Sequence, residues 1–202
     1  MKISSWGLEV IKHFEGFHAR PYRDPVGVLT QGYGHTSMAG PPALGGEWSK
    51  EYATEVLRKT VNDRYAAPIR AMMTRAPSQA QFDAMVSLTY NIGVGAFQRS
   101  SVLRHFNAGN DAAAVASFAL WNKAGGRVFK GLVRRRATEA LMYQGVRDLD
   151  FDGQRDAGEP VYGDLPRGLD PEQVIQDAEP VEPPATVWQL IKAIWHRLTK
   201  GR

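Results

Sequence analysis

Two carboxylates and one hydroxyl stand out near the N-terminus of this 202-residue chain. Glu15 lies where a short helical pattern ends, Asp24 lies at a turn, and Thr30 lies on the extended segment after that turn. Carboxylates in two such different environments can hold different protonation states, and hydrolysis of a glycosidic bond requires one acid and one base. The spacing alone is weak evidence, because most surface carboxylates are simply solvated.

The neighbouring residues predict the elements that would position this trio. Apolar side chains recur at helical spacing over residues 3–14, and Gly16 follows Glu15 as a residue typical of helix ends. The segment 21–34 changes to an extended pattern around a Pro-Val-Gly turn that starts at Asp24, which predicts a small β-hairpin. We therefore expect one carboxylate from a helix end and the other from a hairpin.

The next 110 or so residues are expected to be mostly helical. Ser49 and Ser78 are typical N-cap residues before apolar periodic segments, and the glycines of residues 91–95 interrupt the second of these helices. Further helices are expected at about residues 101–107, 111–121 and 130–143. The predicted fold class is α+β, mostly helical, with one small N-terminal sheet. With no cysteine in the chain, thiolate chemistry and disulfides are excluded.

Three blocks of sequence extend these observations. They are HFEGF, PYRD and GVLTQGYGHT between residues 13 and 36, NIGVGAFQRSS at 91–101, and GLVRRRATE at 131–139. In this order they closely resemble the phage-type lysozymes of glycoside hydrolase family 24, the endolysins, over about residues 3–145. The resemblance implies a lysozyme-like fold and hydrolysis of the β-1,4 bond between N-acetylmuramic acid and N-acetylglucosamine in peptidoglycan, for lysis of a host cell.

The resemblance also implies a role for each residue of the trio. Glu15 would be the general acid that protonates the leaving oxygen, and Asp24 and Thr30 would position and activate the attacking water, with an inverting outcome. A lytic transglycosylase, which needs one acid and no water, is the nearest alternative enzyme. An inactive peptidoglycan-binding module is the alternative outside the enzymes, and an antimicrobial membrane disruptor is compatible with catalysis.

Arg134 is expected from the register to orient Glu15 and to contact substrate. Three adjacent arginines cannot share one helix face, so Arg135 and Arg136 are expected on the solvated surface. His35 is a possible substrate contact, but a hydrogen-bonded core histidine is the favoured interpretation. No motif that reads nucleic-acid bases accompanies the arginines, so nucleic acid is not an expected partner.

The charge divides the chain into three parts. The net charge is about +9 over residues 1–147, about −9 over 148–182 and about +4 over 183–202. We therefore expect a basic catalytic domain at 1–147, an acidic and proline-rich connection at 148–185, and a separate basic helix at 186–202.

The acidic part begins with a pattern typical of a calcium-binding loop. Residues 148–159 match D-x-[DN]-x-[DN]-G-x₅-E at every specified position. The expected ligands are Asp148, Asp150, Asp152, Gln154 through its carbonyl, Asp156 and Glu159. Arg155 and Pro160 depart from the usual loop, and the alternative is a solvated acidic connector. A bound Ca²⁺ would have a structural role; no cofactor is expected for catalysis.

The last part, residues 186–202, has an apolar face with two tryptophans and a cationic face. This pattern resembles an interfacial membrane helix and leaves two interpretations open, which are packing on the catalytic domain or on a second copy and contact with an anionic membrane or lipopolysaccharide. No apolar run reaches the length of a membrane span, and no secretory signal is recognised at the N-terminus. We therefore expect a monomer that accumulates in the host cytoplasm before its release to the peptidoglycan layer.

Overall fold

The computed structural model describes residues 1–24, 27–40 and 42–155; the acidic residues from 156 onward and the C-terminal helix expected at 186–202 lie outside them. The helices are α1 (Ser5–Glu15), η1 (Ser37–Ala39), α2 (Lys50–Val61), η2 (Asn62–Ala66), α3 (Ala67–Met72), α4 (Gln79–Ile92), α5 (Val94–Gln98), α6 (Ser101–Asn107), α7 (Asp111–Phe118), η3 (Ala119–Trp121) and α8 (Lys130–Tyr143). The strands are β1 (His18–Arg23), β2 (Leu29–Gly32), β3 (His35–Thr36), β4 (Lys123–Ala124) and β5 (Arg127–Val128).

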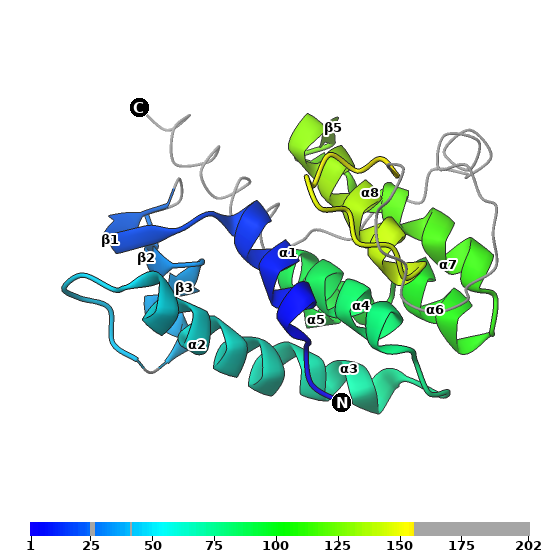
Figure 1. Cartoon of the computed structure of the whole chain (residues 1–202), viewed down its shortest axis with the longest axis horizontal. Helices are drawn as coiled ribbons and strands as arrows, with labels where there is room; N and C mark the ends of the chain where they lie inside the picture. Colours follow the sequence, from blue (N-terminus) through cyan, green and yellow to red (C-terminus); the bar gives the residue numbers. More distant parts are fainter. Residues whose placement is uncertain (25–26, 41, 156–202) are drawn as a thin grey trace, which may run out of the picture.

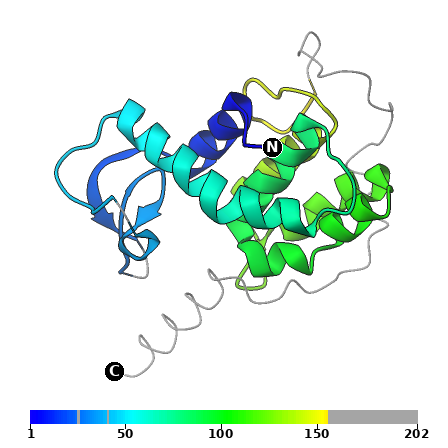
Figure 2. The ribbon, with the colours of Figure 1, turned by 90° about the horizontal axis from the view of Figure 1, so that it is seen from below.

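These elements form two lobes, which Figure 1 shows side by side. One lobe holds the antiparallel sheet β1-β2-β3, and the other holds helices α4 to α8. The continuous run of α2, η2 and α3 passes from the sheet lobe to the helical lobe, as the view from below shows (Figure 2). Helix α1 packs on α4 and leads directly into the sheet. The expectation of a mostly helical fold with one small N-terminal sheet is confirmed.

Helix α1 ends where its sequence predicts. The Ser4 hydroxyl caps its start by accepting a hydrogen bond from the backbone N–H of Gly7 at 3.1 Å. Gly16 follows Glu15 with a φ of +73°, a conformation that glycine adopts without a steric penalty. The helix therefore stops at Glu15, and the chain turns into β1.

The connecting helix is longer than the sequence indicated. The apolar periodicity that follows Ser49 in the sequence ends at Val61, whereas the helical run continues to Met72. Residues 62–66 form a π-helical turn, in which the hydrogen-bond ladder is offset. Pro68 is then placed in the first turn of α3, where a missing backbone N–H is tolerated.

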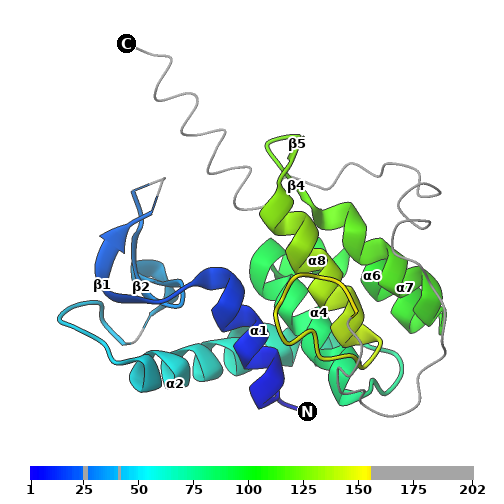
Figure 3. The same ribbon diagram turned by 45° about the horizontal axis from the view of Figure 1, so that its top comes forward.

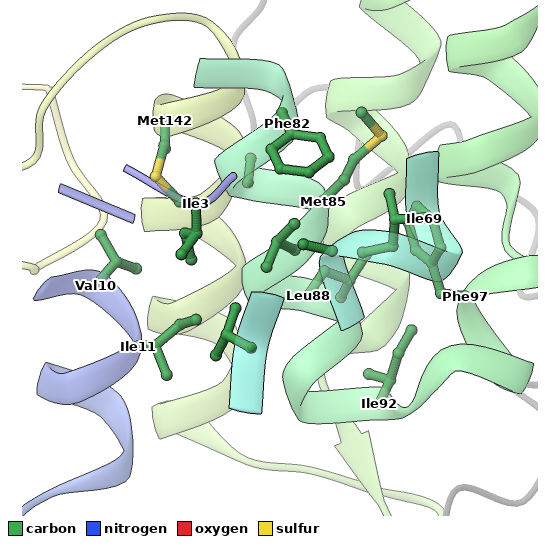
Figure 4. Close-up of a cluster of buried hydrophobic side chains, with 14 of the residues drawn as sticks. Ile3, Val10, Ile11, Ile69, Phe82, Met85, Leu88, Ile92, Phe97 and Met142 are labelled. Atoms are coloured by element: carbon green, nitrogen blue, oxygen red, sulfur yellow. The ribbon is translucent and has the colours of Figure 1, made fainter. Parts of the chain in front are cut away.

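Helix α4 forms the centre of the helical lobe. Most of its residues are buried, and it packs on α1, α5 and α8. Figure 4 shows Phe82, Met85 and Leu88 of α4 among apolar side chains from α1, α3, α5 and α8. The expected capping box at its start is confirmed, because Ser78 accepts from the backbone N–H of Gln81 and the Gln81 side chain accepts from that of Ser78. This core fixes the position of both α1 and α8.

The later helices also match their expected ranges at 101–107 and 130–143. The sequence did not predict the two-residue strands of the β4–β5 hairpin, which precede α8. Every helix in the described part of the chain is too short or too polar to cross a membrane.

Candidate active site

Glu15 is the last residue of α1, and its side chain lies beside the tight turn from β2 to β3. A Cβ placed on Gly34 would lie 3.7 Å from a Glu15 carboxylate oxygen and 3.3 Å from the Tyr90 hydroxyl. The φ of Gly34 is +88°, so glycine serves both the turn and this close approach. The Tyr90 hydroxyl donates to the carbonyl of Tyr33 at 2.9 Å, which ties α4 to the same turn. The Glu15 side chain is 23% exposed and therefore remains open to a ligand.

Arg135 holds the Glu15 carboxylate. Its Nη1 donates to Glu15 Oε1 at 2.7 Å, and the Arg135 side chain is only 4% exposed. Burial opposes the charge of this guanidinium, but Glu15 and Glu139 together outweigh it and raise the pKa of Arg135. The expectation that Arg134 orients Glu15 is therefore wrong by one residue, because one position along a helix turns the side chain by about 100°. Arg134 is exposed and lines the pocket, so its contact with substrate stays a prediction.

Glu139 lies behind this ion pair, fully buried. One of its oxygens accepts from Ser87 Oγ at 2.7 Å, from Arg135 Nε at 3.2 Å and from Arg136 Nη2 at 3.0 Å, and the other pairs with Arg136 Nε at 2.8 Å. Burial lowers the pKa of Arg136 to about 10, and the Glu139 carboxylate opposes that fall. The expected surface positions of Arg135 and Arg136 are therefore wrong: both are buried in a chain of alternating charges that ends at Glu15.

Sequence reasoning missed Glu139, although its spacing offered a signal. An acid at i+3 and i+4 from two arginines is the spacing that allows ion pairs along one helix face. These two ion pairs identify the buried stripe of α8.

Asp24 and Thr30 belong to the β1–β2 hairpin. Asp24 Oδ1 accepts from the backbone N–H of Val28 at 2.8 Å, which fixes the carboxylate at the turn. Thr30 is buried and lies opposite Tyr22 in the strand register. Burial raises the pKa of Tyr22, and the negative charges of Asp24 and Glu15 add to this rise. The charges of both carboxylates therefore act on one phenol, which indicates that the turn with Asp24 faces the same side as Glu15. Neither Asp24 nor Thr30 lines the pocket that contains Glu15, and the Thr30 hydroxyl donates to the carbonyl of Val28 at 3.2 Å.

A pocket of about 500 Å³ contains Glu15. Its wall comes from the ends of α1 and α4, from η3, from the β4–β5 hairpin and from the start of α8. Trp121 and Phe129 supply aromatic surface, while Asn91 and Arg134 supply polar groups. A pocket of this size and mixed lining suits an extended polar molecule such as a sugar chain.

His35 lies outside this pocket. It is buried, and its Nε2 lies 3.2 Å from the carbonyl oxygen of Gly40 and 3.1 Å from that of Pro42, so a proton on Nε2 is shared between two backbone acceptors. The ring also borders a separate cavity of about 110 Å³ beside α2. The favoured core interpretation is supported, and a substrate contact through His35 is not.

The acidic loop, which begins at Asp148, packs against α8 and α1. Asp148, Asp150 and Asp152 each offer a carboxylate oxygen within 4.8 Å of the others, whereas Asp156 and Glu159 lie outside the described residues. Gln154 donates its backbone N–H to Asp152, and Asp148 accepts from Thr138 of α8 and from the backbone of Gly153. The described part of the expected ligand set is therefore assembled in one place.

Phe151 at the middle of this loop stacks on His13, with ring centroids 4.1 Å apart, and on Trp6 at 5.5 Å. Both partners belong to α1, two and nine residues before Glu15. The loop thus braces α1, the helix that ends at Glu15.

Comparisons with known proteins agree with this geometry. A model of the phage lysozyme family matches residues 12–139. The chain is 39% identical to an endolysin of Salmonella phage P22 over 147 residues, covering 70% of this chain and 97% of that protein. It is 38% identical to an endolysin of Bacillus phage PZA over 145 residues, covering 71% of this chain and 55% of that protein. It thus spans about half the length of the PZA relative.

Among solved structures, the chain is similar to the muramidase domain of SpmX from Asticaccaulis excentricus. The two share 35% sequence identity and a TM-score of 0.63, over 70% of this chain and 97% of that one.

Proposed function

Because the chain belongs to the phage lysozyme family, we propose that it is a muramidase that hydrolyses the β-1,4 bond between N-acetylmuramic acid and N-acetylglucosamine in peptidoglycan, for lysis of a host cell. The observation that carries the proposal is the Glu15 carboxylate, held by Arg135 at 2.7 Å in a pocket of about 500 Å³. The names of the endolysin and muramidase relatives support the same reaction.

In the proposed reaction Glu15 donates a proton to the leaving oxygen as the glycosidic bond breaks. The Arg135 guanidinium fixes the orientation of the Glu15 carboxyl group. Because Arg135 also pairs with Glu139, only part of its positive charge acts on Glu15. Asp24 accepts a proton from a water that attacks the opposite face of the sugar, and the Thr30 hydroxyl helps to position that water. Such a single displacement inverts the anomeric configuration.

The first experiment replaces the acid. Glu15→Gln keeps the shape of the side chain but cannot donate the proton, so cleavage of purified peptidoglycan should fall by about 10²–10⁴-fold. The matched control is Glu9→Gln on the same helix, whose carboxylate forms an exposed ion pair with Lys12. A folded Glu15→Gln protein with undiminished release of reducing ends would overturn the assignment.

Product analysis separates hydrolysis from its alternatives. A muramidase leaves reducing N-acetylmuramic acid, whereas a lytic transglycosylase leaves 1,6-anhydro ends that are lighter by one water. Mass spectrometry of the digest therefore tests the role of water directly. Binding to peptidoglycan with no cleavage at all would instead favour the inactive binding module.

We also propose that the loop beginning at Asp148 binds Ca²⁺ in a structural role. The proposal is supported by the twelve-residue pattern and by three carboxylates within 4.8 Å of one another. Calorimetric titration with CaCl₂ should give heat of binding for the wild type and none for Asp152→Ala/Glu159→Ala. Identical titrations without heat of binding would remove the proposal.

The segment 186–202 is proposed to bind an anionic membrane or lipopolysaccharide, on the strength of its amphipathic sequence. Deleting it should leave cleavage of purified peptidoglycan unchanged and weaken binding to vesicles that contain anionic lipid. Unchanged vesicle binding would favour packing on the catalytic domain or on a second copy.

The protein is further proposed to act as a monomer and to remain in the host cytoplasm until its release to the wall. Fractionation of infected cells before lysis tests this location.

A further inference from the structure

The acidic loop is anchored on α8, the helix that carries Arg135. The Thr138 hydroxyl of α8 donates to the Asp148 carboxylate, and both side chains are buried. Gly153 lies against the preceding turn of α8, because a Cβ added to Gly153 would be 3.2 Å from the backbone oxygen of Arg134. In Figure 3 the loop, drawn in yellow, lies across α8 and beside α1. The loop therefore rests on the part of α8 from which Arg135 extends.

The same loop contacts α1 through one aromatic ring. The Phe151 ring is stacked on His13, with an interplanar angle of 13°, and on Trp6, with an angle of 17°. It also makes an edge contact with Phe14, whose ring centroid is 6.3 Å away. Stacked and edge-to-face pairs are the favoured arrangements of aromatic rings. Phe151 therefore contacts α1 along about two turns, up to the residue before Glu15.

Phe14 connects these rings with the ion pair of the active site. The Arg135 guanidinium lies over the Phe14 ring, 5.6 Å from its centre, and the same guanidinium donates to Glu15 at 2.7 Å. Contacts thus run without interruption from Phe151 to Phe14, to Arg135 and to Glu15. A change in how the loop packs on α1 would therefore reach the carboxyl group.

The backbone of Phe151 indicates that these contacts fix its position. Its φ of +59° is the only positive value at a non-glycine residue in the described part of the chain. A bulky residue rarely adopts this left-handed conformation, which persists where surrounding contacts compensate for the strain. The aromatic contacts with α1 supply this compensation, so the ring is held by α1 rather than by a local backbone preference.

We propose that Phe151 is a positioning residue for catalysis. By holding α1 against α8, it sets the direction in which Glu15 presents its carboxyl group to the glycosidic oxygen. The inference rests on the proposed function, in which Glu15 is the acid. Phe151 does not line the pocket of Glu15, so it acts through His13 and Phe14, which do. The loop also lies beyond residue 139, where the match to the phage lysozyme family ends.

The expected effect is on kcat. Proton transfer requires the acid within hydrogen-bond reach of the leaving oxygen, and a misplacement of about 1 Å can lower a rate by about 10²-fold. Phe151→Ala removes the ring and keeps every residue that lines the pocket. The kcat on purified peptidoglycan should therefore fall about 10–100-fold, whereas KM should change by less than about twofold.

Three further variants separate positioning from a general loss of stability. Phe151→Tyr keeps the ring and should keep kcat within about twofold of wild type. Phe151→Leu keeps apolar volume without the flat ring and should lower kcat about 3–10-fold, which gives the same test if the alanine variant does not fold. The matched control is Phe118→Leu in the core of α7, outside the pocket lining, which should lower Tm and keep kcat within about twofold.

A double-mutant cycle tests the contact with α1 itself. Trp6→Ala removes a stacking partner of Phe151 that does not line the pocket. If both rings act through the same stack, Phe151→Ala/Trp6→Ala should lower kcat only about as much as the larger single effect. Circular dichroism of each variant shows whether the protein is folded.

A folded Phe151→Ala protein with kcat within about twofold of wild type would overturn the inference, as would independent effects that multiply in the cycle. A raised KM with kcat retained would overturn it in favour of a direct contact with substrate. An equal fall in kcat for Phe118→Leu would overturn it in favour of stability alone. Failure of the wild type to release reducing ends would instead contradict the proposed function.

Discussion

Replacing Glu139 by glutamine removes the one buried negative charge that two buried arginines share. Arg135 is 4% exposed and Arg136 1%, and after the substitution only Glu15 remains to balance both cations. The new amide also turns N–H groups toward guanidinium donors that now lie 2.8–3.2 Å from Glu139. Breaking a buried pair from one side costs about 3–5 kcal/mol, because it leaves an uncompensated buried charge.

For a domain of about 150 residues this loss should lower Tm by about 6–20 °C. Urea unfolding followed by circular dichroism measures the free energy, and calorimetry measures Tm. The matched control is Glu55→Gln, whose partner Arg58 is exposed, and its effect should stay below about 1 kcal/mol.

A second substitution makes the electrostatic reasoning refutable. In Arg136→Met/Glu139→Gln the remaining charges on Arg135 and Glu15 balance again, so part of the lost stability should return. A Glu139→Gln protein within about 1 kcal/mol of wild type, or a double variant less stable than the single one, would show that charge balance does not govern this region.

Three further outcomes are expected. Gly153→Ala should lower the free energy of unfolding in urea by about 1–3 kcal/mol, because the φ of Gly153 is +85° and the added Cβ would lie 2.6 Å from a side chain of α8. Gly126 has a φ of +75° and open space around it, so Gly126→Ala should lower the free energy of unfolding by less. Ser78→Ala removes the cap of the buried helix α4 and should cost about 1 kcal/mol by the same measurement. Partial burial, and then the charge of Arg134, lower the pKa of His13 below 6.5. The unfolded state therefore binds more protons, and the free energy of unfolding should fall as the pH drops below 6.5. Arg134→Gln should reduce that fall between about pH 7.5 and 5, and an unchanged pH dependence would contradict the effect of Arg134 on His13.

The sequence predicted the helices well where polar caps and glycines mark their ends. Ser49 and Ser78 both cap the helices that follow them, and Gly16 ends α1 directly after Glu15. These signals are local, so a single sequence carries them. The run from Val61 to Met72 was missed because a π-helical turn changes the helical period, and the β4–β5 strands were missed because two residues are too few to show alternation.

The roles of Glu15, Asp24 and Thr30 were predicted by resemblance, whereas the buried ion pairs behind Glu15 were not predicted. Charged residues are exposed by default, so Arg135 and Arg136 were expected on the solvated surface rather than in the core. Both are buried because Glu139 compensates their charge, and this depends on how α8 packs against α4. The phase of α8 is a tertiary property, which explains why Arg135 replaced Arg134 as the partner of Glu15.

The ion pair between Glu15 and Arg135 joins residues that are 120 positions apart. During synthesis α1 leaves the ribosome long before α8, so the acid exists for most of translation without the guanidinium that orients it. Premature termination before α8 likewise gives a fragment with Glu15 and no partner. Assembly of the site therefore depends on near completion of the domain, and a partly synthesised chain lacks the ion pair that orients Glu15.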